Sequence, residues 1–388
     1  MSRIKKVISA LLIGLIIMSG FAASASSAAI KLEIDGKNVA SDVAPIVKDG
    51  RTLVPIRIVA ETLGAQVDWS ASQQKATITT AAYTLVFTIG SASYTVNGSS
   101  KTLDVPPEII NGRTMVPLRV ISESIGATVN YDNAANTAKV NYFTEMSGTV
   151  KITGSTTLQP IAQAAADKLN KMNSGLNISV AGGGSGAGVN DCIAGTNNLG
   201  MSSRELTKEE SAQLTDIAVA NDGIAVIVHP SNTVKNLSAD QAAKIFLGEI
   251  NNWKDVGGSD APILVQTRET GSGTRSTLEE MLLSKQEVVG TATPHTSSAL
   301  IKQAVAREAN AIGFDSIGYV DSTVKALSID NIAPNSETVK SGSYIMGRSL
   351  FILSKGAPSG ASAKFVDYLR TAECQKDIVV KEGYISID

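Results

Sequence analysis

An internal repeat at a spacing of 62 residues constrains the fold of the N-terminal part more than any other feature. Residues 49–78 and 111–140 align without gaps, and eleven of the 30 aligned positions are identical. In each copy the pattern predicts a short strand, a helix that ends at a glycine (Gly64 or Gly126), and a hairpin. Asp35-Gly36 and Asn97-Gly98 predict a tight turn ahead of each copy. We therefore expect one α+β domain of two similar halves, with its own core.

Charged residues recur within this repeat. Arg57 and Glu61 in the first copy correspond to Arg119 and Glu123 in the second. Two interpretations are open, a binding face and ion pairs between residues four apart on a helix, and the spacing favours the ion pairs.

The first 25 residues have the three parts of a secretory signal: a basic start, an apolar run from Val7 to Met18, and small residues at Ala23 to Ala25. The alternative is an uncleaved membrane anchor, although 12 apolar residues are short for a bilayer span. Cleavage would change the formal charge from −2 to −5, because this segment holds three basic residues and no acidic one. A mildly acidic protein has no general attraction for nucleic acid.

Cysteine is scarce in this chain. No cysteine stands directly after the signal, so we expect an exported protein that is not a lipoprotein. Cys192 and Cys374 could form a disulfide or remain as two buried thiols, and the sequence does not favour either state.

The pattern changes after residues 143–149 (FTEMSGT), a predicted linker. From residue 150, apolar runs such as 176–180, 224–228 and 263–267 alternate with helical patterns, the first of them over 158–172. Ser238 and Gln241 fit a capping box that begins another helix. We expect an α/β protein of about 240 residues, which is enough for two lobes.

Three loops rich in Gly, Ser and Thr each precede a predicted helix: 154–157 (GSTT), 182–188 (GGGSGAG) and 271–274 (GSGT). The N-terminus of a helix has unpaired N–H groups, and glycine lets an anion approach them closely. One such loop is ordinary helix capping. Three of them that converge, with Arg268 nearby, would surround an oxyanion with donors. The structural alternative for Arg268 is a surface ion pair with Glu269 or Glu279.

Other chemistries fit the sequence less well. Residues 182–187 match the loose dinucleotide pattern G-x-G-x-x-A, but an exported protein would meet little nucleotide cofactor. The sequence has no G-x-S-x-G elbow and no phosphate loop ending in G-K-[ST]. His229 and His295 are its two histidines, which argues against a histidine-based metal centre. We therefore predict no catalytic residues, no metal and no cofactor.

Residues 30–142 resemble the copper-amine-oxidase N-terminal-like domain, here called the stalk. The resemblance rests on GRTLVPIR and ETLGAQVDW and their second copies. This segment has neither His nor Cys, the ligands that copper favours. We expect a spacer or attachment domain whose partner is a cell-wall or surface component.

Residues 148–388 resemble the phosphate-binding proteins of ABC-type phosphate importers. The resemblance is carried in order by GTVKITGSTTLQPIAQ, VAGGGSGAGV, LGMSSREL, IFLGEINNWKDVGG, RETGSGTR and AIGF…IGYV. It implies a type II periplasmic-binding-protein fold with two α/β lobes. The first lobe would combine about 148–225 with 320–388, and the second would be 226–319.

The same resemblance implies a set of phosphate-binding residues. It comprises Thr156, Thr157, Ser185, Gly186, Ser203, Arg204, Arg268, Ser272, Gly273 and Thr274. Many relatives have Asp where this chain has Ser203, and that carboxylate accepts the proton of the bound phosphate. The Ser203 hydroxyl can donate or accept a hydrogen bond, so the sequence leaves open whether this chain distinguishes protonated from deprotonated phosphate.

The resulting expectation is a monomeric extracytoplasmic receptor that captures inorganic phosphate and delivers it to a membrane ABC permease. Three alternatives remain: a receptor for sulfate or molybdate, a secreted phosphate-ester hydrolase, and a surface adhesion or scaffold protein that has lost binding.

Overall fold

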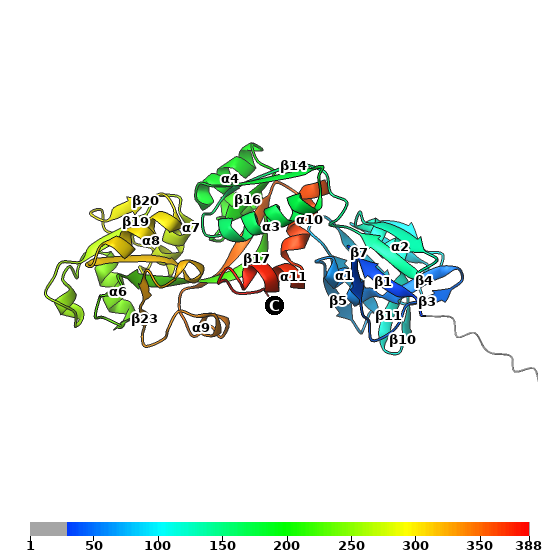
Figure 1. Ribbon diagram of the computed structural model, residues 1–388, viewed down its shortest axis with the longest axis horizontal. Coiled ribbons are helices and arrows are strands. Elements are labelled where there is room, and N and C mark those ends of the chain that lie inside the picture. The colour runs from blue at the N-terminus through cyan, green and yellow to red at the C-terminus, as the bar shows by residue number, and fades with distance from the viewer. Residues whose placement is uncertain (1–28, 388) are drawn as a thin grey trace, which may run out of the picture.

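The computed structural model describes residues 29–387. The stalk, the first lobe and the second lobe lie in a row, with the first lobe in the middle (Figure 1). This arrangement confirms the predicted fold class, two mixed α/β lobes behind a β-rich N-terminal domain. Within the described residues, no helix has both the length and the apolar character that a membrane span requires. The predicted signal at residues 1–25 lies outside them.

The stalk confirms the predicted repeat. Both copies run strand, strand, helix, hairpin. The first consists of β3 (Ile46–Lys48), β4 (Arg51–Pro55), α1 (Ile56–Thr62), β5 (Gln66–Ser70) and β6 (Lys75–Thr79). The second consists of β10 (Glu108–Ile110), β11 (Arg113–Pro117), α2 (Leu118–Ser124), β12 (Thr128–Asp132) and β13 (Thr137–Asn141). Gly64 and Gly126 follow the two helices with φ of +78° and +86°, the left-handed conformation that ends a helix.

The other stalk strands complete three small sheets. They are β1 (Lys31–Ile34), β2 (Lys37–Val39), β7 (Thr84–Thr88), β8 (Ser93–Val96) and β9 (Ser99–Thr102). The sheet orders are β12-β13-β1-β2, β10-β11-β4-β3 and β5-β6-β7-β8-β9. The turns predicted at Asp35-Gly36 and Asn97-Gly98 join β1 to β2 and β8 to β9, and all four residues have positive φ, as type I′ turns require.

The two copies are related by an approximate two-fold axis. Strands β4 and β11 pair antiparallel with Val54 opposite Val116. These two residues occupy the same position in the two copies of the repeat. The ion pairs follow the same relation. Arg57–Glu61 and Arg119–Glu123 form within the copies, as predicted, whereas Arg51–Asp104 and Arg113–Asp42 are exchanged between the two halves.

One long mixed sheet runs through both lobes in the order β15-β14-β16-β24-β17-β21-β19-β20. Its strands are β14 (Gly148–Gly154), β15 (Leu176–Gly182), β16 (Leu199–Ser202), β17 (Thr215–Val228), β19 (Leu264–Arg268), β20 (Thr293–His295), β21 (Ala311–Ser316) and β24 (Gly347–Ser354). The 14-residue β17 pairs first with β24 in the first lobe and then with β21 in the second. This strand therefore connects the lobes.

Helices cover the sheet in each lobe (Figure 1). The first lobe contains α3 (Gln159–Met172), α4 (Ser185–Ala194), α5 (Lys208–Ser211), α10 (Gly360–Leu369) and α11 (Ala372–Cys374). The second contains α6 (Ala239–Phe246), α7 (Gly273–Met281), α8 (Ser298–Arg307) and α9 (Ser336–Lys340). The capping box predicted at Ser238 and Gln241 begins α6.

The chain returns to the first lobe later than the expected position near residue 320. Strands β22 (Lys325–Ala326) and β23 (Ser328–Ile329) pair with the end of β17 and with β18 (Asn236–Leu237), both in the second lobe. Leu327 and Met346 are buried in the core of that lobe. The return is therefore at β24, because the segment before it buries Leu327, Ile329, Tyr344 and Met346 in the second lobe.

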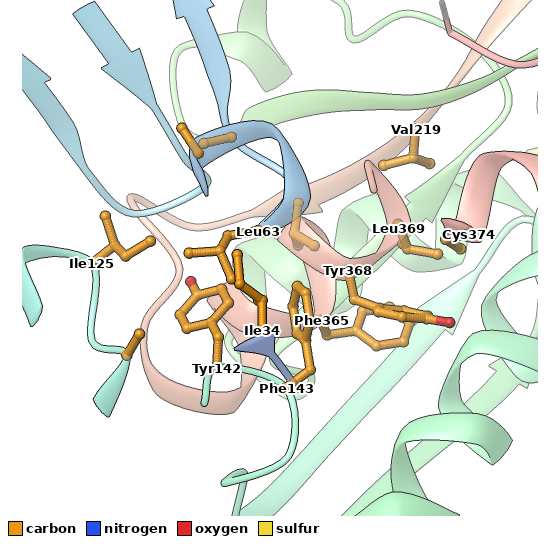
Figure 2. Close-up of a cluster of buried hydrophobic side chains, with 14 of the residues drawn as sticks. Ile34, Leu63, Ile125, Tyr142, Phe143, Val219, Phe365, Tyr368, Leu369 and Cys374 are labelled. Carbon is orange, nitrogen blue, oxygen red and sulfur yellow. The ribbon is translucent and has the colours of Figure 1, made fainter. Parts of the chain in front are cut away.

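The predicted linker is a packed segment. Tyr142, Phe143 and Met146 are at most 5% exposed, and one hydrophobic core runs from the stalk into the first lobe. Figure 2 shows this cluster, in which Tyr142 and Phe143 lie beside Phe365 and Tyr368 of the first lobe. The expectation that the stalk has a separate core is therefore wrong.

Asp367 of α10 is the polar centre of this interface. Its carboxylate accepts hydrogen bonds from the Tyr142 hydroxyl and from the backbone N–H of Ala81, both at 2.7 Å. Burial raises the pKa of Asp367 to about 6, and these two donors oppose that effect. Gly64 packs so closely here that a Cβ on it would lie 2.0 Å from the carbonyl oxygen of Asp367.

The two cysteines are both free and buried. Cys192 lies in α4 and Cys374 in α11. Burial raises the pKa of the Cys192 thiol to about 11 and that of Cys374 to about 12. Of the two states that the sequence left open, the structure has the buried thiols.

Candidate functional site

Each of the three predicted loops connects a strand to the N-terminus of a helix. Residues 154–157 connect β14 to α3, residues 182–188 connect β15 to α4, and residues 271–274 connect β19 to α7. Ser155 accepts from the backbone N–H groups of Thr157 and Leu158, and Ser272 accepts from the N–H of Arg275. Ser272 therefore caps α7, and Ser155 holds the turn that leads into α3. The threonine hydroxyls of these loops are left to face the site.

The loops from the two lobes meet. The hydroxyl oxygens of Thr157 and Thr274 lie 3.0 Å apart, and the Gly186 N–H donates to the Gly271 carbonyl at 2.9 Å. Thr157 and Thr274 are each 1% exposed. The lobes are therefore in contact across a buried cluster of hydroxyl and N–H groups, with the helix N-termini directed to one place.

Ser203, which follows β16, belongs to this cluster. Its hydroxyl lies 3.2 Å from that of Ser185, and its backbone N–H donates to the Ser185 Oγ at 3.0 Å. Gly273 approaches from the other lobe, and a Cβ on it would lie 2.3 Å from the Ser185 Oγ and 2.6 Å from the Ser203 Oγ. Only glycine therefore fits at position 273 without displacing these hydroxyls.

Arg268, at the end of β19, supplies a cation to the cluster. Its side chain is 2% exposed. One Nη donates to the Thr156 hydroxyl at 3.2 Å and the other to the Ser298 hydroxyl at the same distance. Glu269, one of the two partners in the predicted alternative, accepts from Nε and Nη2 at 3.0 and 2.9 Å, but this pair is not at the surface as that alternative supposed. Glu269 thus fixes the guanidinium while two of its N–H groups reach the hydroxyls.

Arg348 of β24 is a second buried cation that the sequence analysis missed. Its guanidinium donates to the Ser203 carbonyl at 3.0 Å and reaches the Thr157 hydroxyl at 3.5 Å. Asp222 of β17 pairs with it at 2.8 Å, and the two side chains are 5% and 0% exposed. Burial raises the pKa of Asp222, although the adjacent guanidinium opposes that shift. The available signal was Asp222, two residues before the apolar run 224–228, because a buried carboxylate is almost always paired.

Arg204 does not take part in the cluster. Its two Nη atoms donate to the carboxylate of Glu210 at 2.7 and 2.8 Å. Glu210 also closes a capping box with Thr207 at the start of α5, and Arg204 lowers the pKa of this carboxyl. The prediction of Arg204 as a second cation of the site is therefore not supported, because Glu210 holds its guanidinium away from the hydroxyls.

Asp315 of β21 is a buried acid beside the cluster. It is 1% exposed, and its Oδ1 accepts from the backbone N–H of Ser316 at 2.9 Å. Burial raises the pKa of Asp315 to about 7; Ser316, Ser298 and Arg268 oppose this effect, while Asp222 adds to it. The carboxyl can therefore change its protonation state near neutral pH.

The carboxylates at this junction neutralise the positive charge of the arginines. Arg268 pairs with Glu269 and Arg348 with Asp222, so the cluster is rich in donors without a large net charge. No group of three or more His, Cys, Asp or Glu side chains that could hold a metal occurs in the described part of the chain. Neutral donors, helix N-termini and braced guanidinium groups are the means by which proteins bind oxyanions.

Comparison with known proteins identifies the family. A family model described as "PBP superfamily domain" matches residues 143–373. The phosphate-binding protein PstS of Bacillus subtilis is 36% identical over 245 residues, which cover 62% of this chain and 81% of that protein. This chain belongs to the phosphate-binding-protein family. A second member, PstS of Borreliella burgdorferi, is 30% identical over 256 residues, which cover 61% of this chain and 90% of the relative.

Solved structures of family members agree with this assignment. A phosphate ABC transporter substrate-binding protein from Clostridium perfringens, solved with bound phosphate, is 37% identical with a TM-score of 0.60 and covers 62% of this chain and 100% of its own. An ABC-type phosphate transport receptor from Vibrio cholerae is 34% identical with a TM-score of 0.53 and covers 61% of this chain and 99% of its own. The stalk matches a different model, "Copper amine oxidase N-terminal domain", over residues 33–140.

Proposed function

We propose that this member of the phosphate-binding-protein family is an extracytoplasmic receptor that binds inorganic phosphate between its lobes and passes it to a membrane ABC permease. One observation carries the proposal: two braced guanidinium groups and hydroxyls from both lobes meet in a single buried cluster. The names of the relatives support the choice of phosphate and of a binding function without catalysis. Export by the predicted signal is part of the same proposal.

The binding residues follow from the cluster. Thr156, Thr157, Ser185, Ser203 and Thr274 would offer their hydroxyls, and Gly186 and Gly273 the backbone at two helix N-termini. In place of Arg204, the second guanidinium would come from Arg348. The contacts that now join donors of the two lobes, such as Thr157 to Thr274 at 3.0 Å, would be replaced by contacts of each lobe to the anion. Phosphate would thus hold the lobes together.

A matched pair of arginine variants tests this assignment. Both Arg268 and Arg204 are paired with a glutamate, but Arg268 alone of the two contacts the hydroxyl cluster. Arg268→Ala should weaken phosphate binding by about 2 kcal/mol, or roughly 30-fold, because charge-assisted hydrogen bonds are lost in a buried site. Arg204→Ala should change the affinity by less than about threefold.

Isothermal titration calorimetry with phosphate, sulfate and molybdate on the full chain measures both effects. Equal affinities for Arg268→Ala and Arg204→Ala would refute the site. Tighter binding of sulfate or molybdate than of phosphate would refute the choice of ligand. Turnover of a phosphate ester by the parent protein, lost in Arg268→Ala, would refute a function limited to binding.

A further inference from the structure

The stalk carries two grooves that the repeat relates to each other. One has a volume of about 410 Å³ and is bordered by α1, β5 and the β10–β11 turn. The other has a volume of about 680 Å³ and is bordered by α2, β12 and the β3–β4 turn. Every residue that lines the smaller groove has its counterpart, 62 positions away, in the larger one. Among these pairs are Arg57 with Arg119, Trp69 with Tyr131, and Arg113 with Arg51.

The grooves collect the exposed apolar side chains of the stalk. Four large hydrophobic residues are exposed in the described part of this domain: Val47 (64%), Trp69 (40%), Ile109 (49%) and Tyr131 (40%). All four line the grooves, as two equivalent pairs. Scattered single exposures need no explanation, but an aromatic ring and an aliphatic side chain exposed together twice, at corresponding positions, indicate a recognition surface.

Each groove also presents two arginines. Residues 29–142 hold ten basic and ten acidic residues, so the stalk as a whole is neutral and these guanidinium groups are a local feature. Their ion pairs with Asp42, Glu61, Asp104 and Glu123 join side chains that are 49–70% exposed. Such exposed pairs contribute about 0–1 kcal/mol. A carboxylate on a ligand could therefore replace these partners at little cost.

We propose that the two grooves bind a carboxylate-bearing polysaccharide of the cell wall, one sugar unit in each. The flat rings of Trp69 and Tyr131 fit the apolar C–H face of a pyranose ring, and the planar guanidinium groups fit its carboxylate. A polymer that repeats one unit suits a domain that repeats one groove. Two weak sites then act together, because binding at the first raises the effective concentration of sugar units at the second.

Co-sedimentation of the full chain with purified, insoluble cell-wall sacculi tests this proposal. Trp69→Ala and Tyr131→Ala should each weaken retention about tenfold, because the remaining site acts without avidity. The double variant should lose more than about a hundredfold, because neither site is left. Leu300→Ala is the matched control, because Leu300 is also exposed (45%) but lies on α8 of the second lobe. Sacculi whose carboxylates have been converted to amides should retain the parent at least tenfold less.

Several results would overturn the proposal. The parent protein could fail to sediment with sacculi, the double variant could sediment like the parent, or the amidated sacculi could bind equally well. Self-association in analytical ultracentrifugation that the double variant abolishes would instead assign the grooves to a second copy of this chain. Phosphate calorimetry on the same variants separates this proposal from the proposed receptor function. Unchanged phosphate affinity in the groove variants would show that these variants are folded. Absence of phosphate binding in the parent would count against the proposed receptor function and not against the grooves.

Discussion

Alanine substitutions at Gly64 and Gly126 would measure how firmly the stalk is joined to the first lobe. The two glycines occupy the same position in the repeat and have nearly the same backbone conformation, with φ of +78° and +86°. Their surroundings differ. A Cβ at Gly126 meets nothing within 4 Å, whereas one at Gly64 lies 2.0 Å from the carbonyl oxygen of Asp367.

The difference between the two variants gives the contribution of the interface. Both alanines must adopt the left-handed conformation, at a cost of roughly 1–2 kcal/mol. Gly64→Ala must also push α10 away from the stalk, since 2.0 Å is far inside the roughly 3.5 Å at which heavy atoms attract. Overpacking of this kind costs about 1–3 kcal/mol. We expect Gly126→Ala to lose about 1–2 kcal/mol of unfolding free energy and Gly64→Ala about 2–5 kcal/mol.

Urea denaturation followed by tryptophan fluorescence and by circular dichroism is the assay. The chain has two tryptophans: Trp69 reports on the stalk, and Trp253, which is buried in the second lobe, reports on the far end. In Gly64→Ala we also expect the fluorescence transition to split into two steps, because the stalk, which contains Trp69, loses its support from α10. Equal losses of unfolding free energy in the two variants would refute the tight contact at Asp367.

Four further outcomes follow from the structure. Arg348→Ala should weaken phosphate binding at least tenfold by calorimetry and lower the unfolding free energy by about 3–5 kcal/mol, because Asp222 is left buried without its cation. Asp315→Asn should become progressively more stable than the parent between about pH 4 and pH 7, by up to roughly 4 kcal/mol. The raised pKa means that the folded parent binds a proton that the unfolded chain releases, so the parent loses stability as pH rises; parallel stability–pH curves for the two proteins would contradict this. Ser203→Asp should reject sulfate more strongly and lose phosphate affinity more steeply above neutral pH, which competition titrations would show, because a carboxylate needs the proton of monobasic phosphate. A chain that begins at Ser147 should unfold at lower urea concentration than the full protein, since it uncovers the apolar face of α10; an unchanged midpoint would show that the stalk contributes nothing.

Local patterns predicted local structure well. The repeat, its glycines and its turns were read correctly because each depends on residues within about ten positions, where periodicity and turn chemistry decide the outcome. The three loops ahead of helices were predicted for the same reason. Arg268 was found because it lies beside one of them.

The errors concern contacts between distant segments. Arg348 meets Ser203 across 145 positions, and its segment has no loop signature. Arg204 was assigned to the site although Thr207 and Glu210 form a capping box that the sequence displays, and that glutamate binds the guanidinium. The linker was misjudged because seven residues with Ser, Gly and Thr look exposed. The Phe143 ring packs on Tyr368 and the Tyr142 hydroxyl donates to Asp367, and both partners lie in α10, more than 200 positions away.

The shared core has a mechanical consequence. Because Tyr142, Phe143 and Asp367 join the stalk to the first lobe, we expect these two parts to move as one unit and the strands that cross to the second lobe to contain the hinge. A partner bound to the stalk would therefore also immobilise the first lobe, and the second lobe would be the part that moves. Spin labels on the stalk and the first lobe should keep a constant separation when phosphate is added, while labels on the two lobes should not. With the stalk held in place, closure of the two lobes around the anion would be a movement of the second lobe alone.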